Sequence, residues 1–196
     1  MIGVVQNPAL KKFQGKRLSE VAQAMHKDAM DALFDLLIED KAFTACAVFG
    51  MSEPDVALAL QQPWVSIDND SSGTSPEGVL GEEHPHPRAY GTFPRILRKY
   101  VREEKNLTLE EAIRKFSALP AQRMRLTDRG VLKQGMWADV VVFDPEKVRD
   151  VATFDDPNRL SEGMDFVLVN GVPVIEGGKM TGSLPGKVLR GAGYLP

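Results

Sequence analysis

The sequence contains one cysteine, Cys46, among 196 residues. A single cysteine excludes an internal disulfide framework and favours a reducing compartment, so we expect a cytoplasmic protein. No run approaches the ~20 consecutive apolar residues of a membrane-spanning helix, and no charged-then-apolar leader opens the chain. The net charge is −3, from 24 Lys and Arg against 27 Asp and Glu. Phosphate binding needs a concentrated basic excess, so neither nucleic acid nor a membrane is an expected partner.

Composition and periodicity favour an α/β fold in the first part of the chain. Hydrophobic residues make up 43% and charged residues 26%, which is ordinary for a folded globular domain. Short apolar runs over residues 2–5, 44–49 and 64–67 predict strands, and the second run would bury Cys46. Helical patterns separate these runs. The order predicts parallel strands joined by crossover helices.

Three helices are expected between and beside these strands. Residues 18–25 form a short helix that Ser19 can cap, and residues 53–60 form another. The segment 28–39 carries one broad apolar stripe, and Asp28 precedes it in a capping position. Each helix is long enough to return the chain to the start of a following strand.

A change in composition follows the third predicted strand. Residues 68–95 are rich in Gly and Pro and have no regular period. A loop of this length inside a compact domain is uncommon unless it is functional or disordered. Helical spacing returns over residues 95–104, and Thr108 with Glu111 forms a capping box that opens a helix over residues 109–117.

The remainder of the chain is predicted to be rich in β-structure. Residues 135–145 read as a strand that begins after a Gly and ends at Asp-Pro. Residues 166–169 and 172–175 are two further strands joined by Asn170-Gly171. Asn-Gly is the preferred pair for a two-residue hairpin turn because both positions adopt positive φ.

Three blocks of the sequence resemble a known enzyme family. The most specific block begins at Trp64-Val65-Ser66-Ile67-Asp68-Asn69-Asp70 and ends in His86-Pro87-Arg88-Ala89-Tyr90-Gly91-Thr92-Phe93-Pro94-Arg95. It resembles the N-acyl-D-amino-acid deacylases (D-aminoacylases), a branch of the amidohydrolase superfamily. Residues 107–115 and 128–144 resemble segments found across that superfamily, namely the helix after the last barrel strand and the return to a small β-sandwich.

The resemblance implies an α/β fold built from the C-terminal part of a TIM-like (β/α)8 amidohydrolase barrel and part of a small β-sandwich domain. The partial barrel would span residues 1–125, and the small β-rich domain with a C-terminal tail would span residues 126–196. A complete barrel needs about 250 residues and eight strands. We therefore expect the metal-binding N-terminal portion to be missing from this chain. The chain would be inactive alone, and its partner would be that portion or further copies of itself.

The resemblance also assigns roles to four residues. Asp70 matches the family carboxylate that takes a proton from zinc-bound water and returns it to the departing amine. Arg88 matches the clamp on the substrate α-carboxylate, which a planar guanidinium can bind bidentately, and Ser71 and Tyr90 are expected to line the pocket. From the residues alone, Asp70 could instead cap a turn and Arg88 could be an exposed loop arginine. Asp68, two residues before Asp70, is a competing acid.

Zinc is the cofactor implied for the complete enzyme, and an N-acyl-D-amino acid is its implied substrate. No metal site is expected in this chain alone. His84-Pro85-His86 has the His-x-His form but lies in a proline-rich loop, with no third ligand nearby in the sequence. Two other interpretations stay open: a non-catalytic amidohydrolase remnant that oligomerises as a structural module, and a different cyclic-amide amidohydrolase such as a relative of dihydroorotase.

Overall fold

The computed structural model describes residues 1–191 and 193–194. The chain divides into two compact units whose segments alternate along the sequence. Unit 1 consists of Met1–Met51, Asp70–Tyr90 and Ala152–Leu160, and unit 2 of Ser52–Asn69, Gly91–Val151 and Ser161–Pro196. The predicted division between residues 125 and 126 concerns the domains of the family and stays a prediction.

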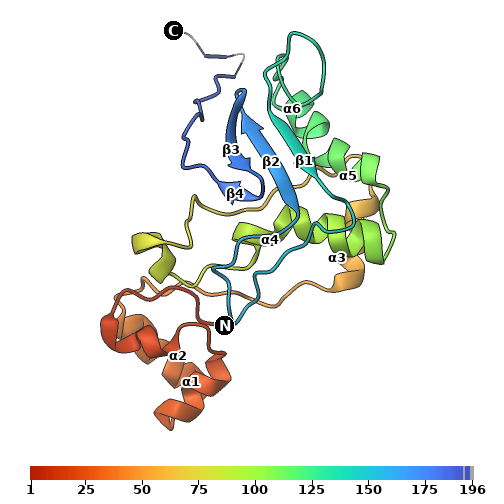
Figure 1. The fold of residues 1–196 in the computed structure, drawn as a ribbon. Helices are drawn as coiled ribbons and strands as arrows, with labels where there is room; N and C mark the ends of the chain where they lie inside the picture. The colour runs from red at the N-terminus through yellow and green to blue at the C-terminus, as the bar shows by residue number, and fades with distance from the viewer. Residues whose placement is uncertain (192, 195–196) are drawn as a thin grey trace. The chain divides into compact units, whose positions relative to one another are not determined.

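Unit 1 is organised around two helices that pack against each other, α1 (Leu18–Met25) and α2 (Ala29–Glu39), as Figure 1 shows. The short helices η1 (Pro8–Phe13) and η2 (Gly78–Glu82) belong to the same unit. Its buried core is made by apolar side chains from the first 36 residues: Ile2, Val5, Leu10, Phe13, Val21 and Leu36. Removing these side chains from water supplies the main driving force for folding of this unit.

The two helices of unit 1 begin close to their predicted positions. Asp28 caps α2 as predicted, because its carboxylate accepts a 2.8 Å hydrogen bond from the Met30 N–H. The predicted cap of α1 is wrong: the helix begins at Leu18, so Ser19 lies within its first turn. The carboxylate of Glu20 satisfies this end of the helix instead, by accepting a 2.6 Å hydrogen bond from the backbone N–H of residue 17.

The parallel pairing predicted for residues 2–5 and 44–49 is wrong. The two runs meet through a single antiparallel bridge between Ile2 and Cys46, and neither forms a strand. Cys46 is exposed and not buried as predicted. Each run is only four to six residues long, and a parallel strand depends on hydrogen bonds from neighbouring strands. Here the two runs are joined by one antiparallel bridge, which is too little pairing to form a strand.

Unit 2 contains most of the remaining helices. Their bounds are α3 (Glu53–Gln61), α4 (Arg88–Arg95, which begins in unit 1), the π-helix η3 (Ile96–Glu103), α5 (Leu109–Phe116) and α6 (Ala118–Arg123). The long loop predicted to reach residue 95 therefore ends earlier, at the start of α4. Thr108 caps α5 as predicted, since its hydroxyl accepts a hydrogen bond from the Glu111 N–H at 3.2 Å. No helix in the described part of the chain combines the length and apolar character of a membrane-spanning segment.

The sheet of unit 2 has four antiparallel strands in the order β1-β2-β3-β4 (Figure 1). The strands are β1 (Val140–Phe143), β2 (Met164–Val169), β3 (Val172–Glu176) and β4 (Lys179–Met180). The predicted hairpin is confirmed: Asn170 and Gly171 join β2 to β3 with φ values of 50° and 83°. Strand β1 is shorter than the predicted run over residues 135–145. The predicted combination of helices and a sheet is confirmed. The described strands pair in antiparallel orientation, whereas parallel pairing was predicted for the first part of the chain.

The third predicted strand, residues 64–67, is also absent. Its backbone is bonded to residues of two helices and not to another strand: the Ile67 N–H donates to the Lys115 carbonyl oxygen at 3.2 Å, and its carbonyl groups accept bonds from side chains. Lys115 of α5 is fully buried and donates from Nζ to the carbonyl oxygens of Gln62 and Val65, the latter at 3.0 Å. Arg123 of α6 donates to the Trp64 carbonyl and to the hydroxyl of residue 66. These bonds hold the segment against α5 and α6 in a conformation that no strand period predicts.

Candidate active site

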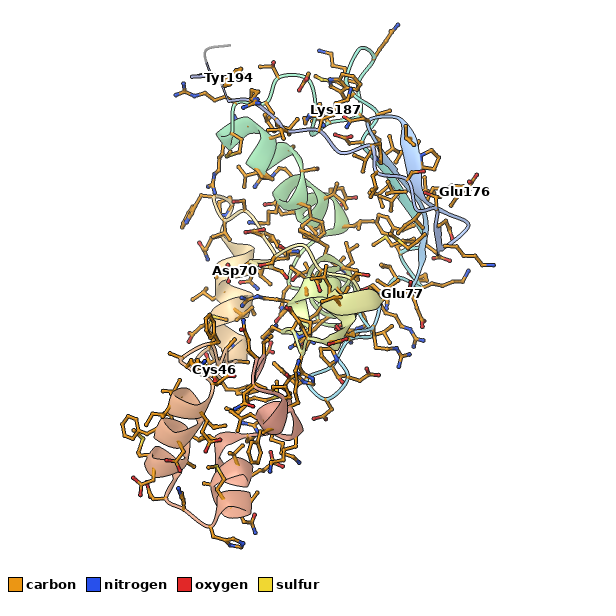
Figure 2. All side chains as sticks on the ribbon, turned by 90° about the vertical axis from the view of Figure 1, so that its left-hand side faces the viewer. Cys46, Asp70, Glu77, Glu176, Lys187 and Tyr194 are labelled. Carbon is orange, nitrogen blue, oxygen red and sulfur yellow. The ribbon has the colours of Figure 1, made fainter. Side chains whose placement is uncertain are left out.

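Asp70 lies in an irregular segment between α3 and η2 (labelled in Figure 2). Its backbone has φ of +45°, in the left-handed region that few residues other than Gly, Asn and Asp adopt. The side chain is 84% exposed. The backbone conformation therefore turns the chain sharply at this residue and presents its carboxylate to solvent.

The guanidinium of Arg88, the first residue of α4, contacts both the side chain and the backbone carbonyl of Asp70. Arg88 Nη2 lies 2.8 Å from Asp70 Oδ2, and Arg88 Nε donates to the Asp70 carbonyl oxygen at 3.0 Å. The structure thus joins the predicted acid and the predicted anion clamp, which are 18 residues apart in the sequence. A charge-assisted pair of this kind is directional, but an exposed ion pair contributes only about 0–1 kcal/mol and can be exchanged for another partner.

The two residues predicted to line the pocket lie in the same unit. The Tyr90 hydroxyl is 3.2 Å from Thr74 Oγ1, and Ser71 donates to the Ser72 carbonyl oxygen at 3.2 Å. Thr74 is a neighbour that sequence analysis missed, since an isolated threonine in a Gly- and Ser-rich loop carries no signal. The competing acid, Asp68, accepts a 2.7 Å hydrogen bond from the N–H of the next residue and so shapes its own turn.

The two histidines of the predicted loop both contact Phe154. His84 Nε2 lies 2.7 Å from the Phe154 carbonyl oxygen, and the His86 ring meets the Phe154 ring edge-on at 5.0 Å. His86 Nδ1 also accepts a 3.0 Å hydrogen bond from the Arg88 N–H. The histidines therefore position the start of α4, and with it the arginine. Phe154 could not be found from the sequence, because it lies more than sixty residues downstream.

The side chains around Asp70 and Arg88 determine whether zinc could be bound here. Within the described part of the chain, no group of three or more His, Cys, Asp and Glu side chains could hold a metal ion. The described residues therefore do not fit the zinc that the family resemblance implies. Two cavities, of about 620 Å³ in unit 2 and about 460 Å³ in unit 1, are lined by neither Asp70 nor Arg88, although Phe154 contributes to the lining of the second.

The chemistry available at this site is that of a carboxylate beside a guanidinium. The Asp70 carboxylate can accept and return a proton, and the Arg88 guanidinium can bind an anionic oxygen pair. Two guanidinium nitrogens already point at Asp70, so a ligand carboxylate must share or replace those contacts. The arrangement is suited to an anionic substrate that undergoes proton transfer.

Comparison with known proteins gives this arrangement a family context. Residues 11–175 match the model of the amidohydrolase family. The N-acyl-D-glutamate deacylase of Alcaligenes xylosoxydans xylosoxydans is 40% identical over 176 residues, which cover 90% of this chain and 33% of that protein. The N-acyl-D-aspartate deacylase of the same organism is 37% identical over 180 residues, with 89% and 35% covered.

Solved structures show the same similarity. The N-acyl-D-glutamate deacylase of Bordetella bronchiseptica, crystallised with zinc and a phosphonate mimic of the tetrahedral intermediate, superposes with a TM-score of 0.76 at 37% identity. The match covers 88% of this chain and 34% of that one. A D-aminoacylase structure gives a TM-score of 0.78 at 33% identity, with 93% and 36% covered. The chain spans about a third of the length of these relatives. Because the family match covers most of its residues, this chain belongs to the amidohydrolase family.

Proposed function

We propose that this chain supplies the proton-transfer and substrate-anchoring residues of an N-acyl-D-amino-acid deacylase. The observation that carries the proposal is the 2.8 Å contact between Asp70 and Arg88. Two residues to which the family resemblance assigns separate roles are in contact, in a chain that is 33–40% identical to deacylases over about nine-tenths of its length.

In this proposal Asp70 acts as general base and then as general acid. Its carboxylate accepts a proton from the water that attacks the amide carbon, and it returns that proton to the departing amide nitrogen. The products are a carboxylic acid and a free D-amino acid. The high exposure of Asp70 in this chain means that the reacting groups need further cover, because electrostatic catalysis depends on a water-excluded site.

Arg88 anchors the α-carboxylate of the substrate. The guanidinium of Arg88 leaves Asp70 Oδ2 as the substrate arrives and binds the incoming carboxylate as a fork. This exchange frees the Asp70 carboxylate at the moment when it must accept a proton. Substrate binding and activation of the base are then a single event, and Ser71 and Tyr90 line the same pocket.

The residues that would hold zinc are proposed to lie outside this chain. The described residues do not fit a metal site, and the deacylases that the chain resembles are about three times as long as the matched part. Within such a complete protein, residues 1–125 would form the last part of a barrel and residues 126–196 part of a small β-domain. On this view the chain alone does not hydrolyse N-acyl-D-amino acids.

A cyclic amidase is the second candidate function. Two dihydroorotases are 33% and 36% identical to this chain, but over 88 and 78 residues only. These matches cover 45% and 40% of the chain, about half of the coverage reached by the deacylases. The deacylase is therefore the better supported activity.

A chimera tests the proposal. The matching third of the Alcaligenes N-acyl-D-glutamate deacylase is replaced by this whole chain, and hydrolysis of N-acetyl-D-glutamate and dihydroorotate is measured with zinc present. We expect deacylation alone. Asp70→Asn should lower kcat by about 10²–10⁴-fold, whereas Arg88→Lys should mainly raise KM because it removes an anchoring fork. Asp68→Asn is the matched control and should retain activity.

The reverse pattern would refute the assignment. Normal turnover by the Asp70→Asn chimera, or loss of turnover in the Asp68→Asn chimera, would move the base to another residue. Hydrolysis of dihydroorotate and not of the N-acyl amino acid would favour the cyclic amidase. Stoichiometric zinc in the purified 196-residue chain, measured by atomic absorption, would contradict the location of the metal ligands.

A further inference from the structure

His86 lies two residues before Arg88 and bonds to the start of α4. Its Nδ1 accepts a 3.0 Å hydrogen bond from the Arg88 N–H, and its carbonyl oxygen accepts a 3.0 Å hydrogen bond from the Ala89 N–H. Both bonds satisfy N–H groups that have no partner within the helix itself. Side-chain caps are usually made by Ser, Thr, Asp or Asn. Here an imidazole nitrogen takes the place of the side-chain oxygen.

The hydrogen bond to Arg88 restricts the protonation of His86. Nδ1 can accept only when it carries no proton, so the ring is neutral with its proton on Nε2. Asn carries an acceptor oxygen at the same δ position, whereas Phe keeps a ring but offers no acceptor. Substitution by Asn or by Phe therefore separates the acceptor of this residue from its ring.

Phe154, from a segment later in the sequence, holds the His86 ring. Its ring meets the His86 ring edge-on, with 5.0 Å between the centroids, and lies 4.8 Å from the Phe49 ring. Its carbonyl oxygen accepts a 2.7 Å hydrogen bond from His84 Nε2. The His84 ring is closely packed in turn, since a Cβ at Gly15 would lie 2.9 Å from it. The His86 ring therefore lies against a side chain that is itself held in place.

The segment that carries Phe154 is also tied to the loop that carries the histidines. Asn158 donates from Nδ2 to the carbonyl oxygens of Gly81 and Glu83, at 3.0 and 2.8 Å. These two bonds grip the chain directly before the histidines. All of these residues belong to unit 1, as do the proposed acid and the proposed anion clamp. The contacts thus form one continuous set within a single compact unit.

We propose that His86 is a positioning residue for substrate binding. By capping the first turn of α4, it fixes the backbone from which the Arg88 side chain reaches Asp70 and, in the complete enzyme, the substrate carboxylate. Phe154 acts through His86, because it holds the ring in the orientation that the cap requires. Arg88 is long and 43% exposed, so the placement of its backbone limits where its guanidinium can lie. The inference rests on the proposed function, since it concerns the anchoring step of that reaction.

Kinetics of the chimera test the inference, with N-acetyl-D-glutamate as substrate. His86→Phe should raise KM about tenfold and change kcat by less than about twofold, because the cap is lost and Asp70 is untouched. His86→Asn should keep KM within about threefold of the parent chimera. His26→Asn is the matched control, since that histidine is exposed and its φ of 53° suits Asn. Unchanged KM in His86→Phe, or equal impairment by Phe and Asn, would overturn the inference.

A double substitution tests whether Phe154 acts through His86. In the parent chimera, Phe154→Leu should raise KM about threefold, because the ring of His86 loses its support. In the His86→Asn background, where no ring remains to be held, the same substitution should add nothing. Equal effects in the two backgrounds would contradict the proposed route and leave Phe154 a structural role only.

Amide hydrogen exchange in the 196-residue chain separates this inference from the deacylase proposal, because it requires no activity. The Arg88 N–H should exchange at least about tenfold faster in His86→Phe than in the wild type, and His86→Asn should resemble the wild type. An inactive chimera together with this exchange pattern would refute the deacylase and still support the positioning of Arg88 by His86. Equal exchange in all three proteins would overturn the inference even if the chimera is active.

Discussion

Two regions of this chain satisfy their backbone hydrogen bonds in different ways. In the β2–β3 hairpin, residues only a few positions apart bond to each other, and Asn170 and Gly171 supply the turn. In the segment 62–67, the carbonyl groups bond to Lys115 and Arg123, about fifty residues or more away. The first region is built from local pairs, and the second is bonded to distant helices.

Unit 1 repeats the second arrangement with a carboxylate in place of an ammonium. Asp40 is buried, with 3% exposure, and accepts hydrogen bonds from the N–H groups of Gln6 and Asn7 at 2.9 and 2.7 Å. It also accepts a 2.7 Å hydrogen bond from the Thr44 hydroxyl. One side chain therefore joins the ends of two segments that lie far apart in the sequence. Regions of this kind depend on single buried polar residues, so single substitutions should have large effects.

Replacement of Lys115 should have the largest effect. Lys115→Met keeps the apolar stem but removes the ammonium from the carbonyl groups of Gln62 and Val65. Acceptors that lose a buried donor cost about 1–3 kcal/mol each, so the free energy of unfolding should fall by about 4 kcal/mol. Lys133→Met, at an exposed position, is the control and should change it by less than ~0.5 kcal/mol. Urea denaturation followed by the fluorescence of Trp64 and Trp137 measures both.

Substitution of two glycines distinguishes strain in the residue's own backbone from a clash with a distant segment. Gly163 and Gly135 have nearly equal φ values, +86° and +88°, but a Cβ at Gly163 would lie 2.5 Å from the backbone of Val148, whereas a Cβ at Gly135 meets nothing within 4 Å. Gly163→Ala should therefore destabilise unit 2 by about 3 kcal/mol. Gly135→Ala carries only the backbone penalty of about 1 kcal/mol. Equal effects of the two substitutions in urea denaturation would show that the approach to Val148 is unimportant.

The Asp40 cluster should make unit 1 sensitive to acid. Burial opposes ionisation of this carboxyl, but hydrogen bonds from Asn7, Thr44 and Gln6 outweigh it and lower the pKa of Asp40 below its usual value. A lowered pKa stabilises the folded state above the unfolded pKa of about 3.9. That contribution is lost as the pH falls below 4 through the folded pKa.

Asp40→Asn provides the comparison for this pH dependence. The substitution removes the charge and should cost about 2 kcal/mol at pH 7, because hydrogen bonds to a charged acceptor are the stronger ones. Amide exchange of Gln6 and Asn7 should quicken in the wild type between pH 4 and pH 2, after correction for intrinsic rates. In Asp40→Asn it should be fast already at pH 7 and should not quicken further. Parallel pH profiles in the two proteins would exclude Asp40 as the acid-sensitive group.

The same contrast explains how much could be predicted from the sequence. The Asp28 and Thr108 caps and the Asn170-Gly171 turn were found because each is a local signal of four residues or fewer. The three parallel strands predicted at residues 2–5, 44–49 and 64–67 were wrong. A buried lysine or aspartate that bonds distant backbone determines the conformation of such segments, and it leaves no periodic pattern in the sequence. Lys115 lies within an ordinary helical pattern.

The candidate site follows the same rule. The family resemblance identified Asp70 and Arg88, and the structure joined them. The family resemblance could not identify Phe154, whose carbonyl oxygen contacts His84 and whose ring contacts His86. The sequence block contains the proposed acid and the proposed anion clamp, whereas Phe154, which contacts the two histidines before Arg88, comes from another segment of the fold.

A substitution in the hairpin turn should have an effect as small as that of Gly135→Ala, because it strains the backbone of one residue only. Gly171→Ala forces a non-glycine residue into φ of +83°, and the nearest side-chain atom to the new Cβ would be that of Ala138 at 4.0 Å. The cost is therefore the backbone penalty alone, about 1 kcal/mol. Gly186→Ala is the control, since the φ of Gly186 lies outside the positive range and nothing lies within 4 Å of its Cβ. A loss above ~3 kcal/mol in Gly171→Ala would mean that the turn organises more than its own two strands. In that case the hairpin would belong with the regions that depend on distant contacts.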